Sequence, residues 1–401
     1  MCSSLAYIGQ GACPLVICLG RFAFCPNAMP LSKRFPLPPL ATIPPQIACV
    51  TDYEAYAQER VEAGSWAYLN SAAADQLTRR SNRSALDAIG LCSRNMMPMH
   101  GGHTQLDLFG TTYAHPIFIA PVAYHRLAHP DGEVATALAA QAMQAPMVVS
   151  TLSSIALEEV AVNTTAPLWF QLYLQPEKTY TQALVSRAEA AGYRALVVTI
   201  DAPVTGLRNA EQRAGFVLPA HISAANLRGM PSPPAYTAAP GTSPIFGSAL
   251  AQGMPTWEDL AWLVSLTRLP VLVKGVLNPK DAQDAMAAGV AGVIVSNHGG
   301  RVLDTLPATI EALPAVTQAV AGKVPILFDG GIRRGTDIVK ALALGASAVL
   351  VGLPIIHGLA AAGATGVAHV LHMLRTELEM AMVLCGCRNL GQINRGVLWR
   401  P

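Results

Sequence analysis

Eight short apolar runs recur along the chain, and alanine-rich segments with the periodicity of amphipathic helices lie between most of them. Such repeats are typical of βα units. Eight strands with helical connections predict an α/β fold, a closed (β/α)8 TIM barrel, although a doubly wound open sheet would share the local pattern. The predicted strands are residues 117–120, 147–150, 168–170, 195–200, 271–273, 292–295, 325–328 and 348–351.

Polar, ionisable or glycine residues follow nearly every one of these runs. In a barrel the carboxyl ends of all eight strands meet at one rim, so these residues would line a single pocket. This pattern favours the barrel over the open sheet. The residues just past the runs include Pro121, Val122, Ala123, Ser153, Gln171, Tyr173, Asp201, Lys274, Ser296, His298, Asp329 and Gly352.

The chain is longer than one ordinary domain, and 52% of its 401 residues are hydrophobic, so it can bury a large core. One barrel with extensions fits this length. We expect residues 1–51 to be a poorly ordered leader and proline-rich linker, and residues 52–401 to form the barrel domain, beginning with a helical extension over 52–88. Residues 1–28 lack the basic stretch and cleavage site of a signal peptide, so we interpret them as an unstructured or artefactual leader.

The longest connection, residues 219–255, follows the fourth predicted strand and is rich in proline, glycine, serine and alanine. Its lack of periodicity predicts a long mobile loop over the rim. A membrane-docking insert is the alternative, but the loop has no lysine cluster. Residues 341–374 are uncharged over a length that could cross a bilayer, yet glycine and proline interrupt them. We interpret this stretch as barrel interior and expect no membrane association.

The charge balance and the cysteines exclude two kinds of ligand. The 27 basic and 25 acidic residues give a net charge of +2 without a basic block, so no nucleic acid partner is expected. None of the eight cysteines has the spacing of a zinc site, so no metal is expected. We interpret them as unpaired thiols in a reducing compartment, which predicts a cytoplasmic protein. Cys385 and Cys387 as a redox pair are the alternative.

A glycine-rich turn, residues 329–335, follows the seventh predicted strand and leads into a helix near Thr336. Glycines let backbone N–H groups approach a phosphate, and the helix N-terminus and Arg333 add positive charge. The turn could instead be only a tight βα loop. Its position after strand seven of a barrel, where cofactor phosphates commonly bind, favours an anion site.

Ionisable residues at the rim indicate proton transfer beside a carboxylate site. His298 can accept a proton near neutral pH, and Asp201, after the fourth strand, could orient it. Arg301 can hold a carboxylate with two hydrogen bonds, and Arg208 could supply a second cation. A lone loop histidine is more often structural. Lys274 ends an apolar strand, so its ammonium projects into the pocket or finds a buried ionic partner.

Four motifs carry a resemblance to a known family. They are FQLY at 170–173, LVKG at 272–275, SNHGGRxLD at 296–304 and DGGIRRGTD at 329–337. Together, and in this order, they resemble the FMN-dependent α-hydroxy acid oxidase/dehydrogenase family, which includes glycolate oxidase, lactate oxidase and mandelate dehydrogenase. The resemblance runs from about residue 52 to residue 398.

This resemblance implies an activity. It implies that bound FMN oxidises a small, lactate-like L-2-hydroxy acid to the 2-oxo acid, and that O2 reoxidises the flavin and gives H2O2. The alternative is a dehydrogenase that passes electrons to a quinone or another carrier. A homotetramer or homo-octamer is also expected.

Residue by residue, the resemblance makes His298 the catalytic base, with Asp201 as its partner. Arg208 and Arg301 become the clamp for the substrate carboxylate. Tyr68 and Tyr173 match the two tyrosines that bond the substrate. Two routes stay open: His298 takes the hydroxyl proton while hydride is transferred, or it takes the Cα proton to form a carbanion.

The resemblance also assigns the cofactor site. Lys274 would stabilise the negative charge of the reduced flavin, a role for which a structural ion pair is the alternative. The residues predicted to bind the flavin are Pro121, Val122, Ala123, Ser153, Gln171, Thr199, Lys274 and Ser296, and those predicted to hold its phosphate are Asp329, Gly330, Gly331, Ile332, Arg333 and Gly352.

The chain departs from the family pattern at several positions. Leu353 stands where the family usually has arginine, which predicts weaker FMN retention. Residues 202–207 lack two basic or polar residues often seen there, and Ala72 replaces a glycine in the loop of the first tyrosine. Ile155 stands where glycolate oxidase has a bulky tryptophan, which indicates room for lactate or a somewhat larger substrate.

Two further function classes have less support. A flavin-dependent isomerase on a related barrel would not need a base, an arginine pair and two tyrosines arranged for a hydroxy acid. A flavin-binding protein without turnover is suggested only by Leu353 and the altered loops.

Overall fold

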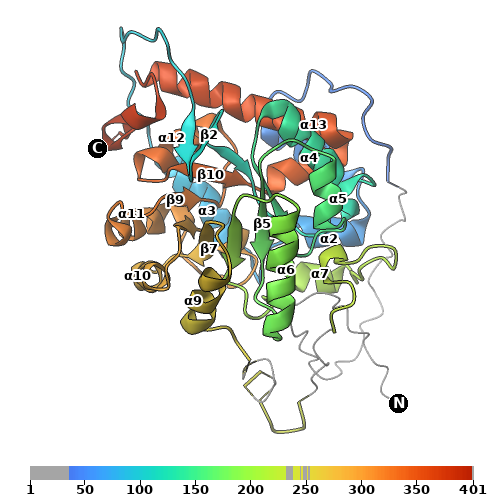
Figure 1. Ribbon diagram of the computed structural model, residues 1–401. Helices are drawn as coiled ribbons and strands as arrows, with labels where there is room; N and C mark the ends of the chain where they lie inside the picture. The colour runs from blue at the N-terminus through green and yellow to red at the C-terminus, as the bar shows by residue number, and fades with distance from the viewer. Residues whose placement is uncertain (1–35, 232–237, 244, 247–250, 252, 400–401) are drawn as a thin grey trace.

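A closed barrel of eight parallel strands forms the centre of the protein (Figure 1). The structure, a computed structural model, describes residues 36–231, 238–243, 245–246, 251 and 253–399. The strands lie in the order β10-β3-β4-β5-β6-β7-β8-β9. Their bounds are β3 (Ile117–Ile119), β4 (Met147–Ser150), β5 (Leu168–Leu172), β6 (Leu196–Thr199), β7 (Val271–Val276), β8 (Gly292–Val295), β9 (Ile326–Phe328) and β10 (Ala348–Val351). All eight predicted strands are therefore confirmed.

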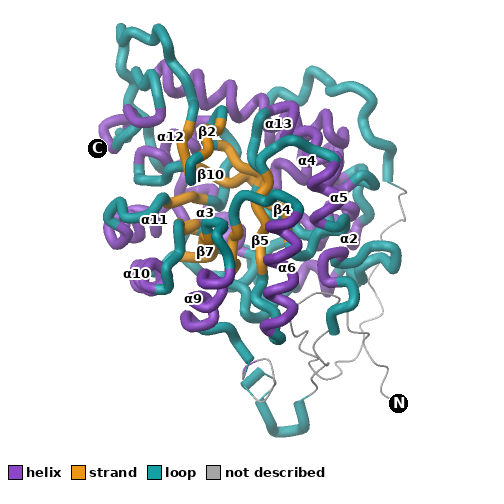
Figure 2. The backbone as a smooth tube through the Cα atoms, viewed as in Figure 1, coloured by secondary structure: helices purple, strands orange, loops and turns teal. Residues whose placement is uncertain are grey.

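Helices surround the strands (Figure 2). The helices that follow or connect strands are α4 (Gly132–Met143), α5 (Leu157–Val162), α6 (Lys178–Ala190), α9 (Trp257–Leu266), α10 (Pro279–Ala287), α11 (Thr309–Val320), α12 (Gly335–Ala343) and α13 (Leu353–Leu384). The predicted N-terminal extension consists of η1 (Val50–Asp52), α1 (Tyr53–Gln58), α2 (Ala63–Asn70) and α3 (Leu77–Ala88). The remaining described helices are η2 (His125–Leu127), α7 (Asn209–Arg213), η3 (Ala225–Leu227), η4 (His298–Gly300), η5 (Leu390–Gln392) and η6 (Arg395–Val397).

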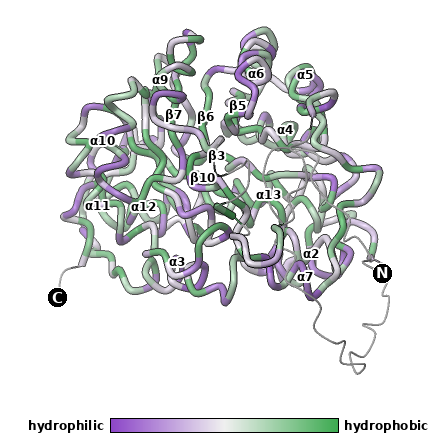
Figure 3. Tube along the Cα trace, turned by 90° about the horizontal axis from the view of Figure 1, so that it is seen from below, coloured by the Kyte–Doolittle hydropathy of each residue, from purple (hydrophilic) through white to green (hydrophobic). Residues whose placement is uncertain are grey.

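Apolar side chains on both faces of the strands explain why each strand reads as an uninterrupted apolar run. In β3, Phe118 belongs to the core inside the barrel, whereas Ile117 and Ile119 pack into the core between strands and helices. In Figure 3 hydrophobic colour is strong on several central strands, and the outer helices are mixed in hydropathy.

A short antiparallel hairpin closes the barrel at the end where the strands begin. It consists of β1 (Leu106–Leu108) and β2 (Thr111–Tyr113), and its Leu108 and Tyr113 join the core inside the barrel. Phe109 and Gly110 form the turn with φ of 51° and 72°, the left-handed pair that tight hairpins require. The sequence analysis missed the hairpin because three-residue strands carry too short a pattern.

The prediction that residues 1–51 are poorly ordered is wrong for residues 36–51. Ile47 and Val50 are buried, and the N–H of Leu40 donates to the carbonyl of Ala361 in α13 at 2.8 Å. Burial of these apolar side chains on α13 outweighs the irregular, proline-rich backbone. Residues 1–35 lie outside the described residues.

We expect deletion of residues 2–28 to leave flavin content and activity unchanged, because this segment lacks the periodicity of a packed element. Flavin absorbance per chain and turnover of the shortened protein check this. Loss of soluble protein on truncation would contradict it.

The loop after β6 is partly fixed to the rim. Within it, Asn226 is fully buried, and its Nδ2 donates to the carbonyl of Ser150 at 3.2 Å and to Ser153 Oγ at 3.0 Å. The N–H of Ala225 donates to the carbonyl of Ser153. This part of the predicted mobile loop is therefore an ordered component of the rim, and several later residues of the loop lie outside the described residues.

One helix in the described part of the chain, α13, is long and apolar enough to cross a membrane. However, 72% of its most apolar window is buried inside the protein. It bends at Ala362 and Gly363 and lies against α4, α12 and α1. These contacts are those of a core helix of the barrel wall.

Candidate active site

His298 and Asp201 form a hydrogen-bonded pair at the rim. Asp201 follows β6 and His298 follows β8, and His298 Nδ1 lies 2.9 Å from Asp201 Oδ1. The backbone N–H of His298 donates to Ser296 Oγ at 3.0 Å and holds the residue at a φ of 56°. Because Asp201 occupies Nδ1, Nε2 is the ring nitrogen oriented to exchange a proton with a ligand.

The charges around Asp201 favour its ionised form. Burial alone would raise the pKa of Asp201, but the charge of His298, its hydrogen bond and the charge of Lys274 lower it below the ordinary value. An ionised Asp201 stabilises His298 after that ring has accepted a proton. Gly275 makes room for the pair: its φ is +109°, and a Cβ there would lie 2.5 Å from the Asp201 side chain.

The two predicted clamp arginines meet at one carboxylate. Glu211 Oε1 lies 3.6 Å from Arg208 Nε and 3.9 Å from Arg301 Nη2. Burial raises the pKa of Glu211, although both arginine charges oppose this. The sequence analysis missed Glu211, for which the only signal was an acidic residue three positions after Arg208.

Tyr68 lies beside this arginine pair. Arg301 Cζ lies 5.4 Å from the centre of the Tyr68 ring, and the ring of Phe216 stacks on the same tyrosine at 4.9 Å. Arg301 Nη1 also donates to the carbonyl of Ser71 at 2.5 Å. The structure thus places Tyr68 against Arg301.

Tyr173 follows β5 directly and is half-buried, and its N–H donates to Thr151 Oγ1 at 3.3 Å. The predicted role of Tyr173 in binding the substrate stays a prediction.

A line of polar side chains crosses the ends of neighbouring strands. Ser150 Oγ donates to Gln171 Oε1 at 3.2 Å, and Gln171 Nε2 donates to Thr199 Oγ1 at 3.0 Å. Thr199 is opposite Lys274 in the register of β6 and β7. Lys274 Nζ continues the line by donating to Ser296 Oγ at 2.7 Å.

Ser153, which we predicted to bind the flavin, is not part of this line. It is fully buried, and its Oγ donates to the carbonyl of Ile155 at 2.5 Å and accepts from Asn226. Ser150, the last residue of β4, lies on Gln171 instead. We therefore correct the predicted set by replacing Ser153 with Ser150, the last residue of the predicted fourth strand.

Ile155 does not support the argument about substrate size. It is 3% exposed, and its Cδ1 packs 3.4 Å from the position a Cβ on Gly132 would take, at the start of α4. The side chain therefore faces the helix layer. The inference from Ile155 to a larger substrate is withdrawn.

Lys274 has an anionic partner within the protein. Its Nζ lies 2.8 Å from Asp329 Oδ2, and both side chains are largely buried. Burial would lower the pKa of Lys274, but Asp329 and Asp201 raise it above the ordinary value. This pair changes the prediction for Asp329: its carboxylate neutralises Lys274 and repels a phosphate.

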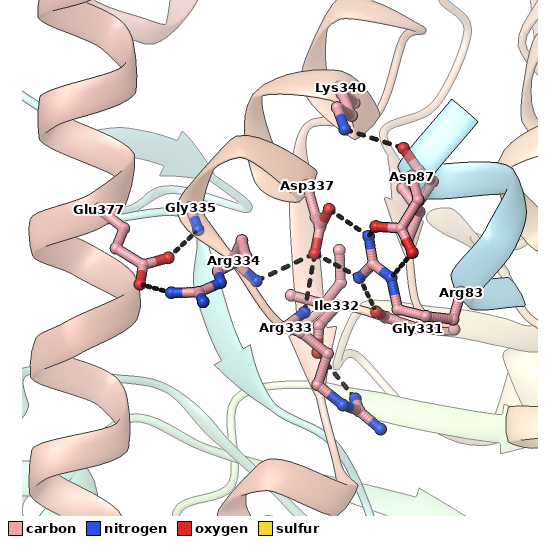
Figure 4. Close-up of polar contacts among 12 residues, drawn as sticks. Arg83, Asp87, Gly331, Ile332, Arg333, Arg334, Gly335, Asp337, Lys340 and Glu377 are labelled. Carbon is pink, nitrogen blue, oxygen red and sulfur yellow. Dashed lines mark hydrogen bonds and ion pairs between the residues drawn. The ribbon is translucent and has the colours of Figure 1, made fainter. Parts of the chain in front are cut away.

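The glycine-rich turn is organised around Asp337 (Figure 4). Asp337 Oδ2 accepts from the N–H groups of Arg333 and Arg334, both at 2.9 Å, and from Arg83 Nη1 at 2.7 Å. The Arg333 guanidinium points away from this cluster (Figure 4). The side chain of Arg333, and not its N–H group, is therefore the donor that the turn offers to an anion.

The other predicted phosphate and flavin residues lie at or just after the ends of β3, β9 and β10. Gly330 and Gly331 have φ of +107° and +88°, and Ile332 is buried. Pro121, Val122 and Ala123 follow β3 and are half-buried, and a Cβ on Gly352 would lie 3.6 Å from Val122. These residues join the turn after β9 to the ends of β3 and β10.

We found no group of three or more His, Cys, Asp or Glu side chains that could hold a metal ion within the described ranges. Among those residues, Cys49, Cys92, Cys385 and Cys387 are free thiols, so no disulfide joins Cys385 to Cys387.

The sequence profile of the FMN-dependent dehydrogenase family matches residues 57–400. The chain belongs to this family. It is 48% identical to the L-lactate oxidase of Alicycliphilus denitrificans, over 90% of this chain and 98% of that protein. It is 44% identical to the peroxisomal (S)-2-hydroxy-acid oxidase GLO4 of Oryza sativa subsp. japonica, over 86% and 94%. A structure of mandelate oxidase with (S)-2-phenylpropionate superposes with a TM-score of 0.78 at 39% identity, over 88% of this chain and 97% of that one.

The residues at the rim of this FMN-dependent dehydrogenase fit its cofactor. The polar line from Ser150 to Ser296 offers donors and acceptors to the edge of a flavin ring. Arg333, whose charge acts on His357 in the first turns of α13, offers positive charge to a phosphate. In the described part of the chain, Asp201 Oδ2 and Asp329 Oδ1 are buried without a hydrogen-bond partner, which marks this rim as a place for polar ligand atoms.

Proposed function

We propose that the protein oxidises a small, lactate-like L-2-hydroxy acid to the 2-oxo acid and that O2 reoxidises its flavin with formation of H2O2. The observation that carries this proposal is the His298–Asp201 pair, 2.9 Å apart, together with the two arginines that meet at Glu211. A proton acceptor beside a carboxylate site is what oxidation of a 2-hydroxy acid requires. Relatives named lactate oxidase and (S)-2-hydroxy-acid oxidase support the same substrate class.

Each residue has a stated part in the reaction. Arg208 and Arg301 bind the substrate carboxylate, and Tyr68, which lies on Arg301, borders the bound substrate. His298 accepts a substrate proton at Nε2 while Asp201 stabilises the protonated ring. FMN, held by the polar line from Ser150 to Ser296 and by Arg333, would supply the two-electron redox chemistry, with O2 as the final acceptor. The proton that His298 takes, from the hydroxyl or from Cα, distinguishes the two routes.

A dehydrogenase that passes electrons to a quinone or another carrier is the second candidate. It is favoured by the name of the matching family, FMN-dependent dehydrogenase. Stopped-flow mixing of the substrate-reduced protein with air-saturated buffer separates the two functions. Rapid reoxidation with one H2O2 per turnover supports the oxidase, and slow reoxidation that a quinone accelerates supports the dehydrogenase.

The purified protein should be yellow and release FMN rather than FAD, because the matching family is FMN-dependent and the turn after β9 offers an anion site for one phosphate. Mass analysis of the released cofactor checks this. Anaerobic addition of glycolate, L-lactate, a long-chain 2-hydroxy acid or mandelate should bleach the flavin, fastest with L-lactate. Absence of bleaching by all four would overturn the proposed function.

Arg301→Lys should raise KM for the hydroxy acid about 10- to 100-fold and leave kcat within about threefold, because lysine keeps the charge but loses the two-point hydrogen bonding of a guanidinium. Steady-state kinetics measure both constants. The matched control is Arg213→Lys, an exposed arginine of α7 that should leave both constants unchanged. A fall in kcat with unchanged KM would argue against a carboxylate clamp.

We further propose a cytoplasmic location and a homotetramer or homo-octamer. Free thiols at Cys49, Cys385 and Cys387 suit a reducing compartment. At the end of α13, Met380, Val383 and Leu384 are each more than half exposed, and oligomers commonly bury such apolar groups. Fractionation of the native cells and light scattering of the purified protein test these two points separately.

A further inference from the structure

Helix α3 places Arg79 next to the glycine-rich turn, residues 329–335, which we predicted to hold the FMN phosphate. The helix touches the turn directly: a Cβ on Gly331 would lie 2.7 Å from the carbonyl oxygen of Asn82, and Arg83 Nη1 donates to the carbonyl of Gly331 at 2.7 Å. Arg79 lies four residues before Arg83 and therefore on the same face of the helix. The N-terminal extension thus brings Arg79, in addition to Arg83, to the edge of the glycine-rich turn.

The guanidinium of Arg79 extends towards the start of α13. It donates through Nη1 to the carbonyl of Asn70 and through Nη2 to Asn70 Oδ1 at 3.3 Å. The same Oδ1 lies 3.1 Å from His357 Nε2. His357 is four residues after Leu353 in α13, so the two share one face of its first turns. Arg79 therefore lies between the turn after β9 and the helix that begins after Gly352.

The site around Arg79 has an excess of positive charge. Within the described residues, neither Arg79 nor Arg333 makes an ion pair with a carboxylate, and Arg79 has only neutral acceptors from Asn70. Burial, and then the charge of Arg79, lowers the pKa of Arg333 to about 10, although the charges of Glu54 and Asp337 oppose this. Burial, then Arg333 and Arg79, lowers the pKa of His357 to about 3, so this ring is neutral near pH 7. Glu54, whose Oε1 accepts from Asn70 Nδ2 at 3.1 Å, acts on both arginines through its charge but forms an ion pair with neither in the described part of the chain. Two partly buried cations near one carboxylate leave a net positive charge that a phosphate would neutralise.

We propose that Arg79 binds the FMN phosphate and supplies the positive charge that Leu353 does not. The two positions are far apart in sequence, but the Asn70–His357 contact brings the Arg79 guanidinium to the helix turn on which residue 353 lies. Arg333 and Arg79 then approach the phosphate from the turn after β9 and from α3. On this basis FMN retention does not suffer from Leu353, which revises the expectation drawn from the sequence.

The test compares FMN with riboflavin, which has the same ring system without the phosphate. Arg79→Leu should weaken FMN binding on the order of 10- to 100-fold, the usual range for a lost charge-assisted hydrogen bond, and leave riboflavin binding within about twofold. Release of FMN from the holoenzyme, followed by recovery of flavin fluorescence, gives the dissociation rate. Titration of the flavin-stripped full chain with each flavin gives the affinities.

Two single variants act as controls. Arg80→Leu changes the neighbouring arginine, whose side chain is exposed and donates to the carbonyl of Asp75, and it should leave both affinities unchanged. Arg79→Lys keeps the charge and should retain most of the FMN affinity. If Arg79→Leu does not fold, Arg79→Gln keeps an amide that can bind Asn70 and removes only the charge.

A double variant tests whether an arginine at position 353 can replace Arg79 in binding the FMN phosphate. Leu353→Arg alone should change FMN affinity by less than about threefold, whereas Leu353→Arg in the Arg79→Leu protein should restore at least tenfold of the loss. Equal weakening of FMN and riboflavin by Arg79→Leu would show a structural role and overturn the proposal. An unchanged FMN affinity would overturn it as well.

Discussion

The His298→Gln protein should bind FMN normally but reduce it with substrate about 10²–10⁴-fold more slowly, or slower still if His298 also positions the substrate. Glutamine keeps a similar volume and a hydrogen-bonding group for Asp201, which lies 2.9 Å from His298 Nδ1, but it cannot accept a proton. Anaerobic stopped-flow absorbance measures the reduction step directly. Flavin content measured on the same sample separates lost chemistry from a lost cofactor.

Asp201→Asn provides the matched comparison. It removes the charge that favours a protonated His298, so reduction should slow while FMN binding survives. Reduction of the His298→Gln protein within tenfold of the normal rate would remove His298 from the proposed reaction. The alternative in which this histidine only fills space at the rim would then stand.

The strands of the barrel could be predicted because each is a local pattern. Residues 147–149 and 293–295 are apolar because one face of each strand packs inside the barrel and the other packs against helices. The observed bounds of β4 and β8 match the predicted ones. The β1–β2 hairpin has no comparable pattern, since each strand has three residues and only Leu108 and Tyr113 are buried. Short elements whose stability comes from the packing of two side chains are not visible in the sequence.

Site residues could be predicted where they belong to a sequence motif at the end of a strand. They could not be predicted where they depend on a contact between residues that are distant in the sequence. Asp201 and His298 follow strands, so their meeting at the rim follows from the barrel itself. Glu211 depends on Arg301, ninety positions away in sequence, and no local feature identifies that contact. The sequence analysis predicted Ser150 as the last residue of the fourth strand and Ser153 as the flavin ligand beyond it, whereas the observed register places Ser150 opposite Gln171.

Packing of the N-terminal segment shows the same limit. The proline-rich sequence around residues 36–45 predicts irregular backbone, and the backbone is irregular. Order in this segment comes from Leu40 and Ile47, which meet α13 and the core far along the chain. Composition predicted the absence of a helix there but not the contact that fixes the segment.

The Lys274→Met protein should lose about 3–5 kcal/mol of stability, because removal of one partner leaves a buried charge uncompensated. Asp329 is 7% exposed, its Oδ2 lies 2.8 Å from Lys274 Nζ, and its Oδ1 has no hydrogen-bond partner in the described part of the chain. Urea unfolding of the flavin-free full chain, monitored by tryptophan fluorescence, measures the loss. Lys274→Met combined with Asp329→Asn removes both charges and should recover at least half of it.

The pH dependence has a definite sign. The pKa of Lys274 is raised in the folded protein, so its contribution to stability is complete below the unfolded value of about 10.4 and disappears as the pH rises through the folded value. The normal protein should therefore lose stability above about pH 10.4, and the double variant should lose less over the same range. Equal alkaline losses in both proteins would contradict this assignment.

The same double variant separates the two roles considered for Lys274. If the lysine is only the partner of Asp329, a folded Lys274→Met/Asp329→Asn protein with bound FMN should be reduced by substrate at close to the normal rate. If Lys274 also stabilises negative charge on the reduced flavin, reduction should remain slow, about 10²-fold or more, because the protein is stable but the charge is missing. We expect the slow reduction, since Lys274 Nζ donates to Ser296 within the polar line and thus lies where the flavin edge would bind. A normal rate would assign Lys274 to the structural ion pair alone.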